Sequence, residues 1–371
     1  MNLLKFVNKI ANESEETEMV SKIRSVLYKN YIKTVVEAVD DTSDGFRMIF
    51  IGNRIKSDFT NPITVECNGA VLWYSREANK FSMLTIPPQL FNSTKMTTKE
   101  IENKYKSDAY KCYPVLDGTI STLYFFKGSW RLSTSKAYDA TKLPMINGKT
   151  YEDIFHESGG TLEGLDEAYC YTVCIKNDNF HVFNKGSHVT FLQRVNLETK
   201  EKEVFQEESS RMSWKTLKNN LHNAVNSFKA KKQVFFGVIL RSESESILLE
   251  SNLMIKLRNF LYNFSFAKKM NPECDLTLAS MVHVYLNRRD VSLYLTLFPF
   301  YKKEFNRFNQ ILESNAKLVI EGKSVNSFCE RAIADLESKK IELPKTEGLK
   351  IAVDFMRSTI YLNEFYELIK F

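Results

Sequence analysis

The stretch that decides the fold is YPVLDGTISTLYFF, residues 113–126. At its centre a turn-forming pair, Asp117-Gly118, precedes a run in which apolar side chains alternate with small polar ones. An Asp-Gly pair favours a turn, and alternation with a period of two is typical of a half-buried strand. The following KGSWRLSTS, residues 127–135, continues the pattern after a Lys-Gly-Ser turn, so a β-hairpin is predicted here.

Similar strand signals extend over most of the first 250 residues. A second hairpin is predicted in TVECNGAVLWYSREANKFSMLTI, residues 64–86, where two apolar runs flank a polar turn. Further strands are expected at 169–176, 189–195 and 234–241. The segment from residue 1 to about residue 40 is expected to be helical. The strands together predict a mainly antiparallel sheet.

The hydrophobic pattern changes its period after about residue 250. Apolar side chains then recur every three or four residues, as on one face of a helix, within 281–286, 305–312, 325–336 and 351–360. Ser324 and Thr346 precede two of these runs and are expected to cap helices. The predicted fold class is therefore α+β. A helical or mixed segment at 1–55 precedes an antiparallel-sheet domain at 56–265 and an all-helical domain at 266–371.

The positive charge is concentrated in one segment. The chain has a net charge of +6, and residues 211–232 contain six lysine or arginine residues and no acidic residue. Apolar side chains from Trp214 to Phe228 recur there at helical spacing behind a potential Ser213 cap, so an amphipathic helix is expected. Its basic face is either ordinary solvated surface or a phosphate-binding surface. The candidate nucleic-acid-binding residues are Arg211, Lys215, Lys218, Lys229, Lys231 and Lys232.

Composition places the chain among globular proteins, with 43% hydrophobic and 26% charged residues. The apolar run VSLYLTLFPFY, from Val291, is about half as long as the roughly 20 residues that a membrane-spanning helix needs. Lysines and acids interrupt the amino-terminal apolar stretch, unlike a secretory signal. We expect an intracellular, cytoplasmic protein that does not contact a membrane.

Two cysteines and two histidines, Cys170, Cys174, His181 and His188, stand in an order that superficially suggests a zinc site. In a strand, however, the sulfurs of Cys170 and Cys174 would lie about 13 Å apart, too far for one tetrahedral ion. Buried strand cysteines and no metal site are expected instead. The chain also lacks the P-loop, nucleophile-elbow, zinc-protease and dinucleotide-binding motifs, which excludes the mechanisms that depend on them.

Between about residues 60 and 250, short motifs follow one another in an order that resembles the adenylyltransferase domain of phage-type RNA ligases. The ligase-like proteins of giant cytoplasmic DNA viruses share this order. In these ligases an E-x-R-G strand and a Pro-containing turn ending in Phe-Asn lead to the nucleophile motif K-x-D-G, and further strands follow. The counterparts here are Glu66-Cys67-Asn68-Gly69, Ile86-Pro87-Pro88, Phe91-Asn92, Val115-Leu116-Asp117-Gly118, WRLSTSKAYDA (130–140), YCYTVCIKNDNFHVF (169–183), VTFLQRVNLET (189–199) and FFGVILRS (235–242).

Three positions differ from what the ligase reaction needs. In such ligases a lysine amine attacks ATP and forms a lysyl-AMP adduct, but here Val115 stands at the lysine position. The nearest earlier lysine, Lys111, would lie about 13 Å back along an extended strand. The family's glutamates for ribose and metal correspond to Thr172 and Phe236, which offer no carboxylate to Mg²⁺.

The last family motif, K-x-K, can be placed in two ways. Distance from Gly237 places it at Leu248 and Glu250, whereas composition places it at Lys256-Leu257-Arg258. Residues 251–263 have helical periodicity, which favours the first placement. The nucleotide-binding residues that the resemblance implies are Asp117, Gly118, Lys136, Lys256 and Arg258.

The resemblance and the missing amine together predict a catalytically degenerate RNA-ligase-like protein of viral origin without a cofactor. It would bind RNA, single-stranded DNA or protein partners in the infected cytoplasm or in the virion. One alternative is an active RNA ligase or nucleotidyltransferase that uses ATP and Mg²⁺ with a displaced nucleophile. Another alternative is a structural or assembly protein with no nucleic-acid role.

Overall fold

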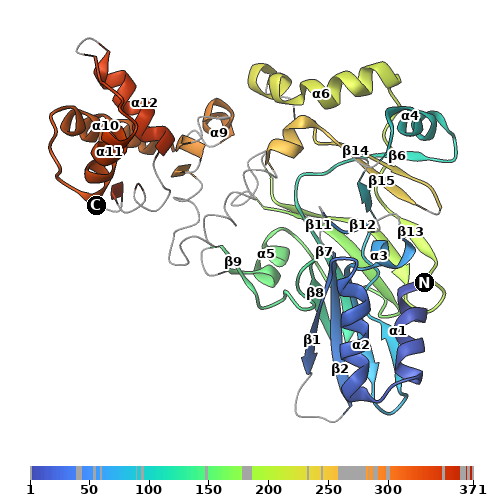
Figure 1. The fold of residues 1–371 in the computed structure, drawn as a ribbon. Helices are drawn as coiled ribbons and strands as arrows, with labels where there is room; N and C mark the ends of the chain where they lie inside the picture. The colour runs from blue at the N-terminus through green and yellow to red at the C-terminus, as the bar shows by residue number, and fades with distance from the viewer. Residues whose placement is uncertain are drawn as a thin grey trace. The chain divides into compact units, whose positions relative to one another are not determined.

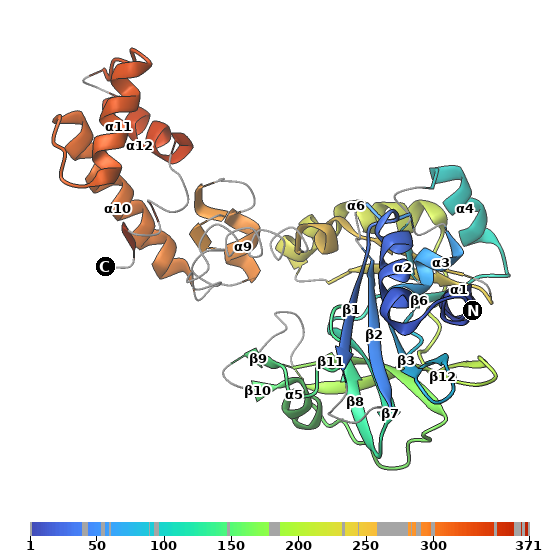
Figure 2. The same cartoon turned by 60° about the horizontal axis from the view of Figure 1, so that its bottom comes forward.

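The chain forms two compact units, Met1–Leu221 with Phe235–Glu250 and His222–Val234 with Ser251–Phe371. The structure is a computed structural model, drawn in Figures 1 and 2. It describes residues 2–38, 44–52, 56–58, 61–88, 90–92, 96–146, 149–177, 186–231, 234–243, 245–257, 281–282, 284–286, 291–297, 301–344, 347–359, 365 and 368–369.

Two helices cover a four-stranded sheet at the start of the first unit (Figures 1 and 2). Each helix buries every fourth residue, for example Leu3 and Val7 in the first and Met19 and Ile23 in the second. These side chains join strand residues such as Phe50 in one core. The sheet has the order β1-β2-β3-β4 with antiparallel neighbours. The elements are α1 (Asn2–Asn12), α2 (Glu16–Tyr28), β1 (Ile32–Ala38), β2 (Gly45–Gly52), α3 (Pro62–Glu66), β3 (Asn68–Ser75) and β4 (Lys80–Met83).

The expectation of helix up to about residue 40 is wrong beyond Tyr28. The backbone reverses at Tyr31, where φ is 58°, and strand β1 then pairs with β2 along its length. Ile32, Val35 and Val36 are β-branched and pack on the core of the sheet, an environment that favours a strand over a third helix. The predicted hairpin at 64–86 is confirmed as β3 and β4, although the helix α3 occupies its first residues.

A five-stranded antiparallel sheet follows, with the order β13-β12-β11-β7-β8. The predicted hairpin at its edge is confirmed: Lys127 and Gly128, with φ values of 48° and 79°, form the turn between β7 and β8. Ile154 and Phe155 of helix α5 pack with Val173 on one face of the sheet. The elements are β7 (Thr119–Phe126), β8 (Ser129–Ser133), β9 (Pro144–Ile146), β10 (Lys149–Thr150), α5 (Tyr151–Glu157), β11 (Tyr169–Lys176), β12 (His188–Asn196) and β13 (Lys202–Val204).

The third sheet has the order β5-β15-β14-β6, antiparallel except for the parallel pair β15 and β5. Helices α4 and α6 cover one face, where Leu217 and Tyr105 pack with Cys112, Leu240 and Ile247. Because side chains alternate along a strand, the opposite face carries Tyr113, Ile239, Arg241 and Leu248. We call it the Arg241 face. The elements are β5 (Leu90–Asn92), α4 (Thr98–Lys106), β6 (Lys111–Pro114), α6 (Trp214–Lys231), β14 (Gly237–Arg241) and β15 (Ser246–Glu250).

The carboxy-terminal residues described in the second unit are helical, as predicted. Phe305, Phe308 and Leu312 are buried along α10, and the predicted runs at 325–336 and 351–360 become α11 and α12. Asn326, rather than Ser324, caps α11 by accepting a hydrogen bond from the Cys329 N–H. Thr346 lies outside the described residues. The named elements are α9 (Val291–Leu297), α10 (Lys302–Ile320), α11 (Ser327–Ser338) and α12 (Gly348–Thr359).

The predicted fold class, α+β with antiparallel sheets followed by a helical carboxy-terminal region, is confirmed. Residues of the amino-terminal segment share their core with strands that lie beyond residue 55. The boundaries at residues 55 and 265 stay a prediction.

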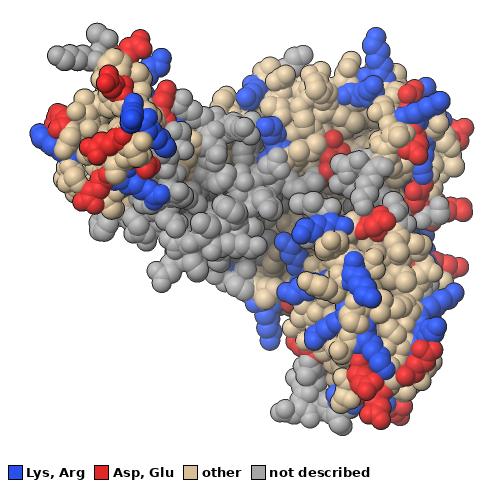
Figure 3. Space-filling model, viewed as in Figure 1, with Lys and Arg blue, Asp and Glu red and all other residues tan. Residues whose placement is uncertain are grey.

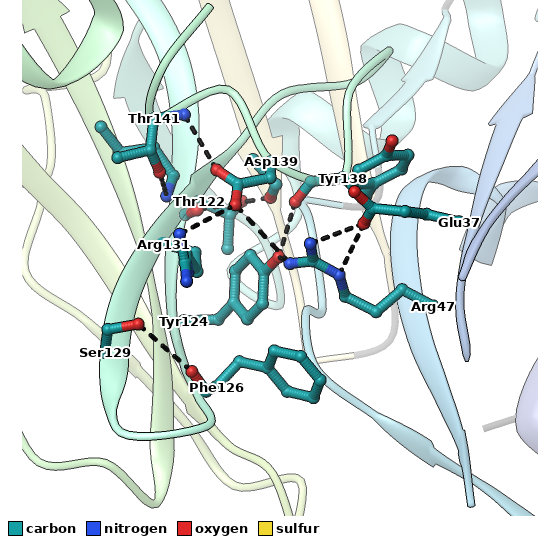
Figure 4. A network of polar contacts seen from close by, with 12 residues as sticks. Glu37, Arg47, Thr122, Tyr124, Phe126, Ser129, Arg131, Tyr138, Asp139 and Thr141 are labelled. Carbon is teal, nitrogen blue, oxygen red and sulfur yellow. Dashed lines mark hydrogen bonds and ion pairs between the residues drawn. The ribbon is translucent and has the colours of Figure 1, made fainter. Parts of the chain in front are cut away.

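A buried polar network links the first sheet to the second (Figure 4). Arg47 of β2 donates hydrogen bonds to Glu37, the closer at 2.6 Å, and lies 3.7 Å from a carboxylate oxygen of Asp139. Arg131 of β8 lies 3.3 Å from the same oxygen. The aromatic rings of Phe126 and Tyr138 each lie 5.1 Å from the Arg47 guanidinium carbon. This network fixes strands that are far apart in the sequence.

Candidate functional site

Val115, which stands at the position of the ligase nucleophile, directly follows strand β6. Its backbone N–H donates a 3.1 Å hydrogen bond to the carbonyl oxygen of Gly237, so two of the ligase-like motifs lie side by side. Strand alternation places Val115 on the Arg241 face with Tyr113 and Lys111. The position expected for a nucleophilic amine therefore carries a half-buried isopropyl group.

Asp117 and Gly118 lie against strand β11. The thiol of Cys174 donates a 3.8 Å hydrogen bond to the carbonyl oxygen of Asp117. A Cβ atom added to Gly118 would lie 2.3 Å from the Cys174 sulfur, closer than atoms can approach. Close packing between the chain before β7 and strand β11 thus requires a glycine here.

Thr172 and Phe236, which replace the family's glutamates, are both buried. Thr172 lies in the centre of the second sheet, paired with Thr122 on one side and Gln193 on the other. Phe236 precedes β14 and is 6% exposed. No group of three His, Cys, Asp or Glu side chains within the described residues is arranged to hold a metal ion.

Glu66 has a structural task. Its carboxylate accepts hydrogen bonds from the backbone N–H groups of Leu3, at 2.8 Å, and Asn2, at 3.0 Å. These groups are at the amino end of α1, where a negative charge is favourable and no intrahelical acceptor exists. The acidic residue of the first ligase-like motif therefore anchors helix α1 to α3.

Lys136 is exposed in the loop after β8, and its backbone N–H donates a 3.2 Å hydrogen bond to the Thr134 hydroxyl. The loop lies close to the first ligase-like motif, since a Cβ atom on Gly69 would lie 2.8 Å from the Cα atom of Ser135. Two motifs that are far apart in the sequence are thus neighbours, and the role of Lys136 in binding phosphate stays a prediction.

The two placements of the last family motif fall in different elements. Leu248 and Glu250 lie in strand β15, whereas Lys256 lies in a helical stretch at 252–257, as its periodicity predicts. Arg258 lies outside the described residues. Lys256 belongs to the second unit, whereas Asp117, Gly118 and Lys136 belong to the first.

Helix α6 confirms the predicted amphipathic helix. Leu217, Ala224 and Phe228 are buried, and the Ser213 hydroxyl caps the helix by accepting a 3.1 Å hydrogen bond from the Thr216 N–H. Figure 3 shows lysine and arginine side chains over this helix. The exposed lysines Lys215, Lys218 and Lys229, which recur at helical spacing, form no ion pair with any described residue.

The remaining members of the basic set differ in their surroundings. Arg211 precedes α6, donates a 3.0 Å hydrogen bond to the carbonyl oxygen of Ser107 and lies 3.7 Å from a carboxylate oxygen of Asp108. Lys231 ends the helix, but its side chain is outside the described part of the chain, and Lys232 is outside it entirely.

The two strand cysteines are buried, as predicted. Burial raises the pKa of the Cys170 thiol to about 11 and that of the Cys174 thiol to about 12. Both sulfurs are therefore protonated near neutral pH, which makes them poor metal ligands and poor nucleophiles. His181 lies outside the described residues.

Two basic residues were not singled out by the sequence patterns. Arg241 is the arginine of the FFGVILRS motif and is only 7% exposed. Lys202 of β13 is exposed, yet partial desolvation and the charge of Arg241 lower its pKa to about 8. The arginine within a ligase-like motif was a usable signal, whereas nothing in the local sequence marks Lys202.

No model of a known protein family matches the chain. Among curated proteins it is 25% identical to a protein named "Putative RNA-ligase" from a Malawian tick isolate of African swine fever virus, with 74% of this chain and 73% of the relative covered. The chain is similar over most of its length to viral RNA-ligase-like proteins. The resemblance expected from the motif order, and the giant-virus source of the relatives, are thus confirmed.

Two further comparisons cover most of the chain. The relative of the same name from the Badajoz strain of the virus is 24% identical, with 81% of this chain and 78% of the relative covered. Among solved structures, an archaeal ATP-dependent RNA ligase covers 92% of this chain and 96% of its own, with 8% identity and a TM-score of 0.40. The ligase-like chain contains, among its described helices, none with the length and apolar character needed to cross a membrane.

Proposed function

We propose that this ligase-like protein is catalytically degenerate and binds nucleic acid. The observation that carries the proposal is Val115, an aliphatic side chain at the end of β6 where the resemblance requires a lysine amine. The buried Thr172 and Phe236 support it, because neither supplies the carboxylate that the resemblance requires for the metal ion. A scaffold without nucleophile and metal ligands has no route to the lysyl-nucleotide adduct.

The loss of adduct formation can be tested directly. The full chain is incubated with Mg²⁺ and ATP or GTP labelled at the α-phosphate and is then run on a denaturing gel beside an active RNA ligase. We expect a labelled band for the active ligase and none for this chain. A covalent band at its mass would overturn the degenerate function.

Helix α6 is the proposed nucleic-acid contact. Its exposed lysines have no carboxylate partner among the described residues, so their charges remain available for phosphates. Arg211 contributes less, because Asp108 lies beside it. The charge pattern favours contact with the phosphate backbone over recognition of bases, since no ion pair within the described residues orients Lys215, Lys218 or Lys229.

Salt dependence tests this contact. Binding of single-stranded RNA and DNA is measured at several salt concentrations for the wild type and for Lys215→Ala/Lys218→Ala. We expect weaker binding, with the slope of log affinity against log salt smaller by about 1.4 for the two lost contacts. The matched control is Lys5→Ala/Lys9→Ala on α1, two exposed lysines, which should leave the slope unchanged. If the wild type binds neither nucleic acid at low salt, the structural or assembly function is favoured.

One observation favours an active enzyme as the second candidate. The lowered pKa of Lys202 gives it a larger neutral fraction than an ordinary lysine, as a nucleophilic amine requires. In this reaction the amine would attack the α-phosphorus of ATP, lose a proton and release pyrophosphate. An adduct that disappears in Lys202→Arg, and persists in Lys111→Arg and Lys136→Arg, would establish this function.

A further inference from the structure

Strand β1 is the outer strand of the first sheet, and one of its two edges is open (Figure 1). All seven of its residues pair with β2 in a regular register. On the other side, no described residue forms a hydrogen bond with the backbone of β1. Because every second residue of a strand points its N–H and C=O groups away from the neighbouring strand, β1 presents a row of unpaired donors and acceptors.

The opposite edge of the same sheet is closed by a side chain. The amide of Asn8 in α1 donates a 3.1 Å hydrogen bond to the carbonyl oxygen of Phe81 in β4, and the Phe81 N–H donates a 2.7 Å hydrogen bond back to the Asn8 amide oxygen. Strand β6, at the edge of the third sheet, is covered by the chain itself, since the Ser209 N–H donates a 2.8 Å hydrogen bond to the carbonyl oxygen of Cys112. Proteins commonly protect edge strands in such ways, and an unprotected edge of seven residues is a surface that pairs with another chain.

The sequence of β1 is complementary to itself in one antiparallel register. A two-fold axis at the central residue, Val35, pairs all seven residues of the strand with those of a second copy. The residues two before and two after Val35 then face one another, so Lys33 of each copy lies opposite Glu37 of the other. Parallel pairing in register would instead place like charges side by side, which is unfavourable. Charge therefore selects an antiparallel second copy.

Both charged side chains are placed for this contact. Lys33 is exposed and forms no ion pair with any described residue. The Glu37 side chain is 31% exposed, and Arg47 holds its carboxylate with a 2.6 Å hydrogen bond. A carboxylate can accept about four hydrogen bonds, so Glu37 can receive a lysine in addition to Arg47. Lys33, Val35 and Glu37 alternate along the strand, so the charge pairs and the Val35 pair form on the same face.

We propose that β1 joins two copies of this protein as an antiparallel, two-fold symmetric pair. The first sheet of one copy continues into the first sheet of the other across residues 32–38. None of these residues belongs to α6 or to the ligase-like motifs. The pairing therefore requires neither nucleic-acid binding nor the loss of nucleotidyl transfer, and it stands independently of the proposed function.

Sedimentation of the chain over a range of concentrations tests the pairing. We expect a monomer–dimer equilibrium for the wild type. Lys33→Glu turns two attractive charge pairs into two repulsive ones and should weaken dimerisation by about tenfold or more. The matched control is Lys80→Glu, which makes the same change at an exposed lysine of β4, on the closed edge of the sheet. It should dimerise as the wild type does.

Cysteine cross-linking identifies the register. Opposite Cα atoms of an antiparallel pair lie about 4.5–5.5 Å apart, within the range of a disulfide. Val35→Cys, at the two-fold axis, should therefore form a disulfide-linked dimer on mild oxidation. Lys33→Cys should not, because its sulfur lies about 13 Å along the strands from that of the second copy. The wild type, oxidised in parallel, gives the background.

Three results would overturn the proposal. The first is a wild type that sediments as a monomer at every concentration. The second is equal dimerisation of Lys33→Glu and Lys80→Glu, which would assign the contact to another surface. The third is cross-linking of Val35→Cys no stronger than that of Lys33→Cys. If Val35→Cys does not fold, the exposed position 33 still decides the question.

Discussion

The guanidinium of Arg47 donates a 2.9 Å hydrogen bond to the hydroxyl of Tyr124, 77 residues away in the sequence. The same hydroxyl donates a 2.7 Å hydrogen bond to the carbonyl oxygen of Tyr138, so strand β2 of the first sheet is tied to β7 and to the loop after β8 (Figure 4). Burial raises the pKa of Tyr124, which keeps the phenol protonated and able to donate. The amino-terminal helices and sheet are thereby held on the ligase-like strands.

Removing the charge of Arg47 is expected to be strongly destabilising. Arg47→Met leaves Glu37 without its cation, Asp139 with Arg131 alone and the Tyr124 hydroxyl without its donor. Breaking a buried ion pair from one side costs about 3–5 kcal/mol of unfolding free energy. Urea unfolding measures the loss, with Arg194→Met as the exposed-pair control at about 1 kcal/mol or less. A loss for Arg47→Met no larger than that of the control would contradict the role of this network.

The close approach at Gly118 predicts coupling with Cys174. Gly118→Ala places a methyl group 2.3 Å from the Cys174 sulfur and 3.0 Å from the carbonyl oxygen of Ile175. We expect a loss of about 1–3 kcal/mol, the range for overpacked cores. Cys174→Ala should relieve part of it, so the double variant loses less than the sum of the two single variants. Gly348→Ala, whose new methyl group makes only ordinary contacts, is the neutral control. Strictly additive losses would mean that the sulfur does not limit the packing.

Restoring the amine alone is expected to be insufficient for adduct formation. Val115→Lys supplies a nucleophile at the end of β6, but Thr172 and Phe236 still provide no carboxylate for the metal ion. We expect no labelled protein after incubation with labelled ATP and Mg²⁺. Circular dichroism of the variant verifies that it folds. A covalent band in Val115→Lys, absent from the wild type, would show that the lost carboxylates are dispensable and that the side chain at 115 alone limits the reaction.

The pKa of Lys202 predicts a pH dependence of stability. The folded chain holds this pKa at about 8, below the ordinary 10.5, because of burial and repulsion by Arg241. Between these two values the unfolded chain binds more protons, so the unfolding free energy rises with pH in that window. We expect the stability of the wild type, relative to Lys202→Met, to increase from about pH 7.5 to about pH 9.5. Urea unfolding of both proteins at the two pH values measures this difference in stability. A difference that does not change with pH would mean that the pKa of Lys202 is not lowered in the folded chain.

Much of the local structure could be predicted from the sequence. The strand predicted at 169–176 matches β11, and the amphipathic segment predicted at 211–232 matches α6. Each element buries one face, and the spacing of its apolar residues in the sequence indicates which face that is. The prediction failed at 32–38, where a β-branched run pairs with a strand that comes later in the chain. The hydrophobic period and the β propensity of residues 32–38 do not specify the strand with which they pair.

The candidate site, too, was predictable from the sequence only in part. The motif order alone placed Val115 at the nucleophile position, and β6 beside β14 brings it next to Gly237 as that order requires. Glu66, which resembles a functional acid in the sequence, is instead the cap of α1. Its role depends on a helix more than 50 residues earlier, which no local pattern links to it.

By itself, the sequence determined most of the element types, the ligase-like order of the motifs and the absence of an amine at position 115. Each of these follows from short runs of consecutive residues. The tertiary structure decided which charges meet. Arg47 reaches Tyr124 only because two sheets pack, and the Glu66 carboxylate meets the first N–H groups of α1 only because α3 folds beside that helix. Electrostatic energy depends on the distance between charges and on their burial in the folded chain. Neither quantity can be obtained from residues that are adjacent in the sequence.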